Sequence, residues 1–498
     1  MSAAEQMISR VHPWLDGKLK KLFINGEWVE GSTGRTFESR NPATGELLAE
    51  VAEGDAEDIN RAVRAARAAF NGPWSKFKPY DRQEVLLRLC DLMDKHYDEL
   101  SLLETLDMGG PISRTRSRKT SIIGMLRYYA GMATALHGEV VENSQPGHIF
   151  TYTSKEPIGV VGAITAWNGP INAVIWKLGP ILATGCTAVF KPAEEAPLCA
   201  LRIAELSLEA GIPPGVFNVV SGFGETAGAA LSAHEDVDKI AFTGSHITGQ
   251  HLIRASAGNI KRLSLELGGK SANIVFADAD LDLAVPGSAM AAFSNTGQVC
   301  GAGTRLFVER KVHDQFVEKV AAYGKSLKVG NGQDPKTQIG PLVSQQQLER
   351  VTGYFAIGQN EGASVASGAE RVSEGDLSKG YFVSPTVFAN VKDEMRIARE
   401  EIFGPVVSVL PFDDIDEVIA RGNASQYGLG GGVWTQNLKK AHRIAKGLRS
   451  GSVWVNCWMT RDPAMPFGGY KMSGYGRESG IQHLEEFLNV KSVWMNVT

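Results

Sequence analysis

The chain contains the apolar segment Ile158-Gly-Val-Val-Gly-Ala-Ile164, which has the length and composition of a strand buried on both faces. Four further short apolar segments follow it, separated by helical stretches such as 197–209 and 225–231. They are Thr187–Phe190, Val216–Val220, Lys239–Phe242 and Arg262–Leu265. Five such strands joined by crossovers predict an α/β fold with a doubly wound parallel sheet of the Rossmann type.

The segments on either side of this sheet predict a hairpin and a second α/β unit. Leu22–Val29 contains an Asn-Gly pair, which favours a tight turn between two short strands. A second alternation of strands and helices begins at Asn273–Phe276 and continues past Val453–Asn456. The last segment, Phe487–Val497, alternates like an edge strand, so we expect it to pair with the segment near residue 150 or with another subunit.

Composition and charge exclude several classes of protein. The length of 498 residues predicts about three domains at ~150 residues each. Hydrophobic residues make up 43% of the chain and charged residues 21%, as in an ordinary globular protein. The 51 basic and 55 acidic residues give a net charge of -4, so no overall positive field would hold a polyanion. We therefore expect no nucleic-acid partner.

The cysteines predict neither a disulfide framework nor a metal site, because they are scattered, odd in number and form no Cys-x-x-Cys pair. They are Cys90, Cys186, Cys199, Cys300 and Cys457. Residues 1–21 hold no apolar run of signal-peptide length, and no stretch of ~18 consecutive apolar residues occurs. We expect a cytoplasmic protein with no membrane-spanning segment and no metal.

Three windows place reactive groups beside glycines at the ends of predicted elements. Cys300 lies in Asn295-Thr-Gly-Gln-Val-Cys300-Gly-Ala-Gly303, where a carbonyl could approach the sulfur, although a buried structural cysteine would also fit. Glu266 ends a predicted strand and could act as a general base or pair with Lys270. Asn168 follows the first strand and could donate to an oxyanion or serve only as a turn residue.

A basic cluster precedes a predicted helix that ends at residues 126–130. Its members are Arg114, Arg116, Arg118 and Lys119. Because charged runs are usually solvated, we interpret this cluster as an exposed loop or the rim of an oligomer interface.

Seven windows together make the chain resemble the aldehyde dehydrogenase superfamily along nearly its whole length. They are Trp167-Asn168, Lys191–Glu194, Phe242–Ser245, Leu265–Ser271, Gly297–Cys300, Glu400–Pro405 and Pro466–Gly474. The resemblance implies a Rossmann-type NAD-binding domain (1–135 and 155–266), an α/β catalytic domain (267–480) and a small β oligomerisation arm (136–154 and 481–498). It also implies a homodimer or homotetramer.

The resemblance further implies NAD-dependent oxidation of an aldehyde to a carboxylic acid. Cys300 resembles the nucleophile that forms a thiohemiacetal, whose oxyanion the Asn168 amide and the Cys300 backbone N–H would hold. Glu266 resembles the base that activates water to hydrolyse the resulting thioester. Its presence argues against transfer of the acyl group to coenzyme A.

For the cofactor, the resemblance implies a site on the Rossmann-type domain. Glu194, beside Lys191, suits free ribose hydroxyls and would repel a 2′-phosphate, so we expect NAD rather than NADP. Ser245 would hold pyrophosphate at a helix N-terminus, and we interpret His246, which follows it, as an ordinary helix-start residue. The expected cofactor-binding residues are Ile164, Thr165, Trp167, Lys191, Glu194, Gly224, Ser245, Leu267, Glu401 and Phe403.

The expected substrate tunnel departs from the pattern of many relatives. Ala166 and Gly169 stand where proline and a bulky residue are common, which would widen the tunnel beside Cys300. Broad apolar walls would suit a bulky aromatic or terpenoid aldehyde. The expected substrate-contacting residues are Ser121, Gly169, Trp176, Trp458, Arg461 and Phe467.

Arg461 favours a different substrate. The segment Asn456-Cys-Trp-Met-Thr-Arg-Asp462 resembles the branch that oxidises muconic-type semialdehydes, in which this arginine grips a carboxylate. Against this, Asp462 could neutralise Arg461, and Ser121 offers no charge where that branch carries a second arginine. A carboxylate-bearing semialdehyde, a bulky neutral aldehyde, or small aldehydes with a structural Arg461 all stay open.

Two other functions are weighed against the dehydrogenase. A catalytically idle family member could act as a structural or binding protein, although all three catalytic positions are filled. A cysteine hydrolase would need a His or Asp partner for the thiol, and no such motif presents itself.

Overall fold

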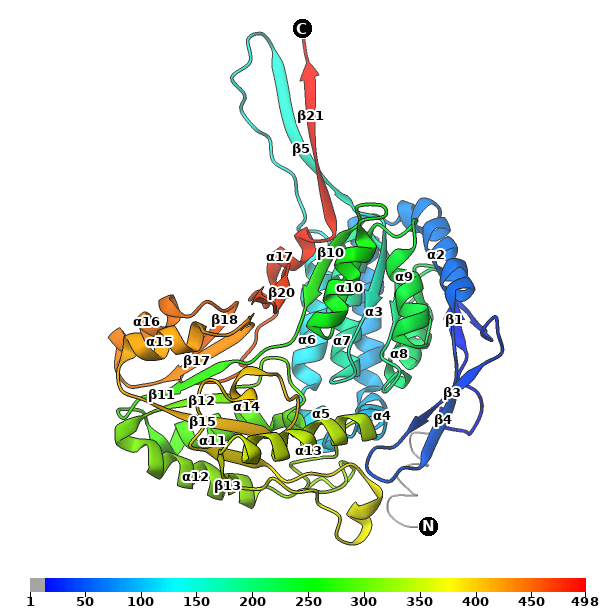
Figure 1. Cartoon of the computed structure of the whole chain (residues 1–498). Helices are drawn as coiled ribbons and strands as arrows, with labels where there is room; N and C mark the ends of the chain where they lie inside the picture. Colours follow the sequence, from blue (N-terminus) through cyan, green and yellow to red (C-terminus); the bar gives the residue numbers. More distant parts are fainter. Residues whose placement is uncertain (1–13) are drawn as a thin grey trace.

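The computed structural model describes residues 14–498. Two largely parallel sheets with helices on both faces form the body, and a long two-stranded arm projects from it (Figure 1). The larger sheet has the strand order β2-β1-β8-β7-β6-β9-β10-β20, and the second has the order β13-β14-β15-β12-β11-β17-β18. The predicted α/β class is confirmed.

The five predicted parallel strands form the centre of the larger sheet. They are β6 (Val160–Ile164), β7 (Thr187–Lys191), β8 (Phe217–Val219), β9 (Lys239–Thr243) and β10 (Arg262–Glu266). β7 and β9 lie parallel to β6 on its two sides, so the chain order reverses there. In open α/β sheets, ligands bind in the crevice outside the carboxyl ends of the strands at such a reversal.

Shorter elements complete this sheet and its edges. The predicted hairpin is confirmed as β1 and β2, with Leu22 opposite Val29. The bounds are β1 (Leu22–Ile24), β2 (Glu27–Val29), β3 (Thr36–Arg40), β4 (Leu47–Ala52) and β20 (Gly474–Tyr475). β20 pairs antiparallel with β10, so this late segment returns to the first sheet.

Helices cover both faces of the larger sheet. One face carries α3 (Pro79–Lys95), α4 (Tyr97–Met108), α5 (Ile112–Ser117), α6 (Lys119–Met132), α7 (Pro170–Thr184) and α8 (Leu198–Glu209). The other carries α2 (Ala56–Asn71), α9 (Ala229–Ala233) and α10 (His246–Ser256).

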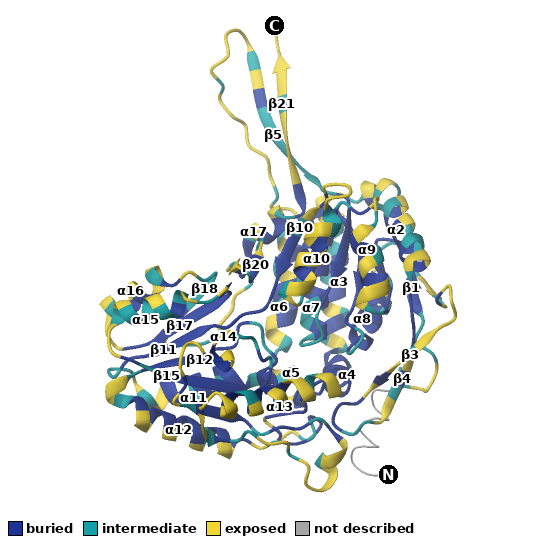
Figure 2. Ribbon diagram, in the orientation of Figure 1, coloured by how far each residue is buried: buried dark blue, intermediate teal, exposed yellow. Residues whose placement is uncertain are grey.

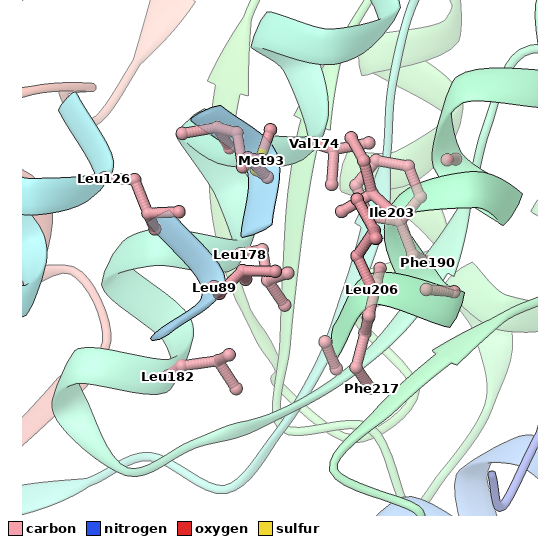
Figure 3. Packing of buried hydrophobic residues seen from close by; sticks show 14 of the residues in the cluster. Leu89, Met93, Leu126, Val174, Leu178, Leu182, Phe190, Ile203, Leu206 and Phe217 are labelled. Carbon is pink, nitrogen blue, oxygen red and sulfur yellow. The ribbon is translucent and has the colours of Figure 1, made fainter. Parts of the chain in front are cut away.

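The core beneath α3, α7 and α8 fixes the position of the first sheet. Leu89 of α3, Leu178 of α7 and Ile203 of α8 belong to one buried cluster with Phe190 of β7 and Phe217 of β8 (Figure 3). Successive apolar residues on these helices are three or four positions apart, so each helix turns one stripe toward the sheet.

The second predicted α/β series is confirmed. Its strands are β11 (Ala272–Val275), β12 (Arg305–Glu309), β13 (Ser364–Ser367), β14 (Thr386–Ala389), β15 (Val406–Phe412), β17 (Gly430–Trp434) and β18 (Ser452–Val455). Its helices are α11 (Leu281–Phe293), α12 (His313–Ser326), α13 (Gln345–Asn360), α14 (Arg396–Arg399), α15 (Ile415–Asn423) and α16 (Leu438–Gly447). β16 (Tyr427–Gly428) pairs with β19 (Tyr470–Lys471) beside this sheet.

The arm consists of β5 (Ile149–Pro157) and β21 (Leu488–Asn496), paired antiparallel from Pro157 opposite Leu488 to Ile149 opposite Asn496. This confirms the first of the two pairings expected for the last segment. β21 is mostly exposed, whereas β5 is mostly half-buried (Figure 2). β5 continues past residue 154, and α17 (Gly480–Glu485) packs on α7 at the base of the arm. The domain boundaries proposed above stay predictions.

Within residues 14–498, no helix is both long enough and apolar enough to cross a membrane.

A buried hydrogen bond ties α17 to α6. The Tyr129 hydroxyl lies 2.7 Å from His483 Nδ1. Burial raises the pKa of Tyr129 and lowers that of His483, so both are neutral and the hydroxyl donates to the ring nitrogen. Tyr129→Phe should lower the free energy of unfolding by about 1 kcal/mol, the usual value of such a bond.

The measurement is urea denaturation, and Tyr128→Phe is the matched control. Tyr128 is the neighbouring residue, and among the described residues its hydroxyl has no hydrogen-bond partner. Equal losses in the two variants would contradict a specific contribution from the Tyr129 bond.

Candidate active site

Most of the expected catalytic and substrate residues converge on one cavity of about 530 Å³. Its walls come from the loop after β6, from α6, α7 and α11, and from the loop after β18. The expected residues that line it are Ser121, Asn168, Gly169, Trp176, Cys300, Trp458 and Arg461. Ala166 also lines the cavity, which is necessary if its small side chain is to widen the tunnel beside Cys300 as predicted.

The loop that carries Cys300 has an unusual backbone. Asn295 and Thr296, just after α11, both have positive φ angles, 54° and 58°. Asparagine adopts this conformation readily, but it is costly for the β-branched Thr296 and persists there only where the surroundings enforce it. Asn295 Nδ2 donates to the Asn168 carbonyl at 3.0 Å, and Gln298 Oε1 accepts a backbone N–H from a neighbouring loop at 3.0 Å. The loop is therefore fastened on two sides.

Asn168 is attached to the same loop. Its Nδ2 donates to the Gln298 carbonyl at 2.9 Å. An amide nitrogen carries two hydrogens, so one remains for a ligand in the cavity that Asn168 and Cys300 share. The side chain thus bridges to the Cys300 loop rather than to its own turn.

Cys300 is half-buried at the cavity wall. Burial raises the pKa of its thiol to about 12, the Arg461 charge opposes this rise, and Glu266 reinforces it. A Cβ on Gly269 would lie 2.6 Å from the Cys300 carbonyl oxygen, so only glycine lets the chain after Glu266 pack here. In the described chain, no carboxylate or imidazole hydrogen-bonds the sulfur, so nothing supports the cysteine hydrolase.

Glu266 is buried at the end of β10, and its Oε1 has no hydrogen-bond partner among the described residues. Burial, and next the Glu478 carboxylate, raise the pKa of Glu266 well above its ordinary value, while Lys177 and Arg461 oppose this. The alternative of an ion pair with Lys270 is wrong, because the Lys270 amine is also without a partner in residues 14–498.

The sequence analysis missed a buried ion pair beside Glu266. Lys177 Nζ and Glu478 Oε1 lie 2.5 Å apart, and both side chains are almost inaccessible. Both residues line the cavity. Lys177 is a single charge within the otherwise apolar helix α7, and that isolated charge was the signal that could have identified it.

Most of the residues expected to bind the cofactor lie at or after the carboxyl ends of β6, β7, β8 and β9. Lys191 Nζ, at the end of β7, is 2.6 Å from Glu194 Oε2. Ser245 caps α10 and accepts the Thr248 backbone N–H at 3.0 Å, while a Cβ on Gly224 would meet open space. A carboxylate for ribose hydroxyls and a helix N-terminus for phosphate are the donor set that a dinucleotide needs.

A second group lies nearer Cys300. Glu401 Oε1 accepts the Gly269 backbone N–H at 3.0 Å, and burial raises the pKa of Glu401 to about 7. The Phe403 ring meets the Trp167 ring edge-on, with centroids 5.3 Å apart.

The other expected cofactor residues differ in what they can offer. Thr165 follows β6, and its backbone N–H donates to the Lys191 carbonyl at 3.2 Å. Ile164 and Leu267 have side chains buried in a core cluster, so they can contact a cofactor mainly through their backbone N–H and C=O groups.

The interpretation of the basic cluster was wrong for two of its members. Arg114 on α5 and Arg118, which precedes α6, line the cavity. Arg116 and Lys119 point away and pair with surface aspartates. Residues four apart share a helix face, so a run of charges that looks uniform in sequence is divided between cavity and solvent.

Arg461 is held between two aromatic rings. Its guanidinium carbon lies 4.6 Å from the centre of the Trp176 ring and 4.0 Å from that of Phe467. Among residues 14–498 Asp462 forms no ion pair with Arg461, and its Oδ1 instead accepts the Ala464 backbone N–H at 2.9 Å. Trp458 forms a further wall and donates to the Gly301 carbonyl at 3.2 Å.

The model of the aldehyde dehydrogenase family matches residues 28–493 of the chain. The chain belongs to the aldehyde dehydrogenase family. Benzaldehyde dehydrogenase of Antirrhinum majus is 48% identical over 495 residues, which cover 99% of this chain and 92% of that protein.

Solved structures agree with this assignment. The NAD⁺ complex of aldehyde dehydrogenase from Bacillus cereus has a TM-score of 0.95 and 48% identity, covering 98% of this chain and 99% of that chain. AldA indole-3-acetaldehyde dehydrogenase of P. syringae, in complex with NAD⁺ and IAA, has a TM-score of 0.95 and 43% identity, covering 99% of each chain. The protein is an NAD-dependent aldehyde dehydrogenase; its place in the muconic-type branch stays a prediction.

The electrostatics of the site predict how fast Cys300 reacts with an alkylating agent. Arg461 is the main charge that favours the thiolate, so Arg461→Gln should raise the pKa of Cys300 further. At a given alkaline pH the variant should then react more slowly with iodoacetamide, because only the thiolate attacks.

The measurement is the alkylation rate of Cys300 against pH, followed by mass spectrometry. Arg461→Lys keeps the charge and is the control. A Gln variant whose rate profile matched that of the wild type would show that Arg461 does not act on the thiol.

Proposed function

We propose that Cys300, Glu266 and Asn168 carry out the oxidation of an aldehyde to a carboxylic acid. The main support is that these three residues lie close together. Cys300, a half-buried thiol in a fastened loop, and the Asn168 amide line one cavity, and the buried Glu266 carboxyl, which has a free oxygen, lies near enough to Cys300 for its charge to raise the pKa of the thiol.

In the first step, the Cys300 thiolate forms a bond to the aldehyde carbon. The carbonyl oxygen becomes an oxyanion, which accepts hydrogen bonds from the second Asn168 amide hydrogen and the Cys300 backbone N–H. These donors are fixed in place by the loop's own hydrogen bonds, so they need little reorganisation as the charge develops.

The chemistry that NAD supplies when bound is acceptance of a hydride, which leaves a thioester on Cys300. Lys191 and Glu194 would hold the adenosine ribose, and the helix start at Ser245 would hold the pyrophosphate. Glu401 and Phe403 would hold the nicotinamide end. The Glu194 carboxylate favours NAD over NADP, since a 2′-phosphate there would meet a negative charge.

In the last step, Glu266 takes a proton from a water molecule that attacks the thioester. The carbon–sulfur bond breaks, the acid leaves, and the Cys300 thiolate is restored. A carboxylate whose pKa is raised is a stronger base than an ordinary one. The Lys177–Glu478 ion pair lies near Glu266, and its two charges act on the pKa of Glu266 in opposite directions. A catalytically idle protein would have no use for this arrangement.

The substrate is either a carboxylate-bearing semialdehyde or a bulky aromatic or terpenoid aldehyde. The unpaired Arg461 supports the first, and the Trp176 and Trp458 walls support the second. The relatives named for benzaldehyde and indole-3-acetaldehyde also favour an aromatic group. We further propose that the enzyme acts in the cytoplasm, which its five free cysteines support.

The proposal predicts that Glu266→Gln stops turnover after one cycle. With NAD⁺ and benzaldehyde, the variant should release a burst of about one NADH per active site and then stall, because the thioester is not hydrolysed. Rapid-mixing absorbance measures the burst, and Cys300→Ala should show neither burst nor turnover. Steady turnover in either variant would contradict its assigned role.

The arm supports assembly into a homodimer or homotetramer. Its exposed apolar residues and unpaired strand edges are suited to contact another copy. The exposed apolar residues include Phe150, Val490, Trp494 and Val497. Removal of residues 488–498 should therefore yield monomers in light-scattering chromatography, whereas Val490→Ser, with β21 intact, should only weaken assembly. A truncated chain that kept its full assembly would contradict this use of the arm.

A further inference from the structure

A buried histidine, His483, lies on α17 shortly after Glu478 in the sequence. Its ring is almost fully buried, and it is not among the described residues that line the cavity. Burial, and next the Lys177 charge, lower its pKa well below the ordinary value, so the ring is neutral. A buried polar ring needs hydrogen bonds to replace those that water would supply.

Two hydrogen-bond donors converge on one nitrogen of this ring. The Tyr129 hydroxyl lies 2.7 Å from His483 Nδ1, and the Ser479 backbone N–H donates to the same atom at 3.1 Å. A ring nitrogen that accepts carries no hydrogen, so the proton of the neutral ring is on Nε2. His483 is thus a fixed acceptor that connects α6 to the residue directly after Glu478.

The backbone that His483 holds is strained. Ser479 has φ 61° and ψ 166°, a combination that essentially only glycine adopts without cost. A serine keeps this conformation only where its neighbours enforce it. The bond from the Ser479 N–H to His483 is one constraint, and the bond from the Gly480 N–H to the Pro463 carbonyl, at 2.7 Å, is another. Loss of the His483 acceptor would therefore allow this turn to relax toward an ordinary conformation.

The turn at Ser479 determines where the Glu478 carboxylate lies. Glu478 exchanges two backbone hydrogen bonds with Phe467, of 2.6 and 2.7 Å. Its side chain is buried, with Oε1 2.5 Å from Lys177 Nζ and with Oε2 lacking a partner among the described residues. Because one oxygen is free, the carboxylate has little besides Lys177 to fix its orientation. Its position therefore depends on the backbone that the turn holds.

The position of the Glu478 carboxylate matters for Glu266, because interactions between buried charges are strong and depend on distance. The Glu478 charge raises the pKa of Glu266, whereas the nearby cations oppose this. A Glu478 side chain that moved away would therefore lower the pKa of Glu266. The titratable groups that act on Glu266 or that it acts on are Glu478, Lys177, Arg461, Arg477 and the Cys300 thiol.

We propose that His483 is a positioning residue, which through the Ser479 backbone fixes the Glu478 carboxylate beside Lys177 and Glu266. It acts on the hydrolysis of the thioester only through the charge that it holds in place. The inference rests on the proposed function, because it assumes that Glu266 activates water. It assigns a use in the reaction to the base of the arm, where α17 packs on α7 and bonds to α6.

A purely structural histidine would need only the bond to Tyr129, which ties α17 to α6. The positioning role needs the bond to Ser479 as well. Tyr129→Phe removes the first bond and leaves the second. His483→Leu removes the acceptor of both, whereas His483→Asn, which has nearly the same shape as the leucine variant, returns an oxygen near the position of Nδ1.

The test measures how the hydrolysis step depends on pH. Each full-length variant, in excess over benzaldehyde, is mixed with NAD⁺ and quenched in acid at successive times. Mass spectrometry then follows the loss of the benzoyl thioester from Cys300 over a series of pH values. In the wild type, hydrolysis should speed up as Glu266 loses its proton and should reach a plateau at higher pH.

His483→Leu should move the midpoint of this profile to lower pH by about 0.5–1 unit, because the Glu478 charge no longer raises the pKa of Glu266 fully. Its plateau should fall at least ~5-fold, since a base of lower pKa takes a proton from water less readily. His483→Asn should restore most of both. Tyr129→Phe should lose stability in urea but keep the wild-type profile.

His483→Leu leaves two buried donors unpaired, which lowers its stability. Combined with Tyr129→Phe, it leaves only the Ser479 N–H unpaired, so the double variant should show the same shift in midpoint even if the single variant does not fold.

The outcomes separate the two levels of the proposal. A midpoint that stays in place or moves to higher pH without the His483 acceptor would overturn the positioning role and leave the proposed reaction intact. Equal profiles in the Leu and Asn variants, or in His483→Leu and Tyr129→Phe, would overturn it as well. A wild-type enzyme that formed neither NADH nor a thioester would overturn the proposed function, and the inference with it.

Discussion

Two reciprocal amide hydrogen bonds join the carboxyl end of β6 to the loop that carries Cys300. Asn168 donates to the Gln298 carbonyl, and Asn295 donates to the Asn168 carbonyl. β6 belongs to the sheet expected to bind the cofactor, and the Cys300 loop follows a helix of the second sheet. These bonds therefore help to fix Cys300, the proposed nucleophile, relative to the crevice at the ends of the strands, and the left-handed backbone at Thr296 is the main cost of that attachment.

Burial then determines the chemistry of the groups brought together. Glu266 is buried and Cys300 is half-buried, so burial raises both pKa values and neighbouring charges act on both groups. Glu478 opposes ionisation of Glu266, while Lys177 and Arg461 favour it. The same cations would stabilise an oxyanion, so the polarity of the cavity suits both the attack and the hydrolysis.

The sequence predicted the strands well and indicated Cys300, Glu266 and Asn168 as catalytic candidates, for a physical reason. Strands buried on both faces leave unbroken apolar runs, and Cys300 lies beside glycines that close packing requires, as Gly269 shows. What could not be predicted is the direction of charged side chains. Arg114 and Arg116 look alike in sequence, yet one lines the cavity and the other pairs at the surface. The contact between Lys177 and Glu478 depends on tertiary structure that no local pattern records.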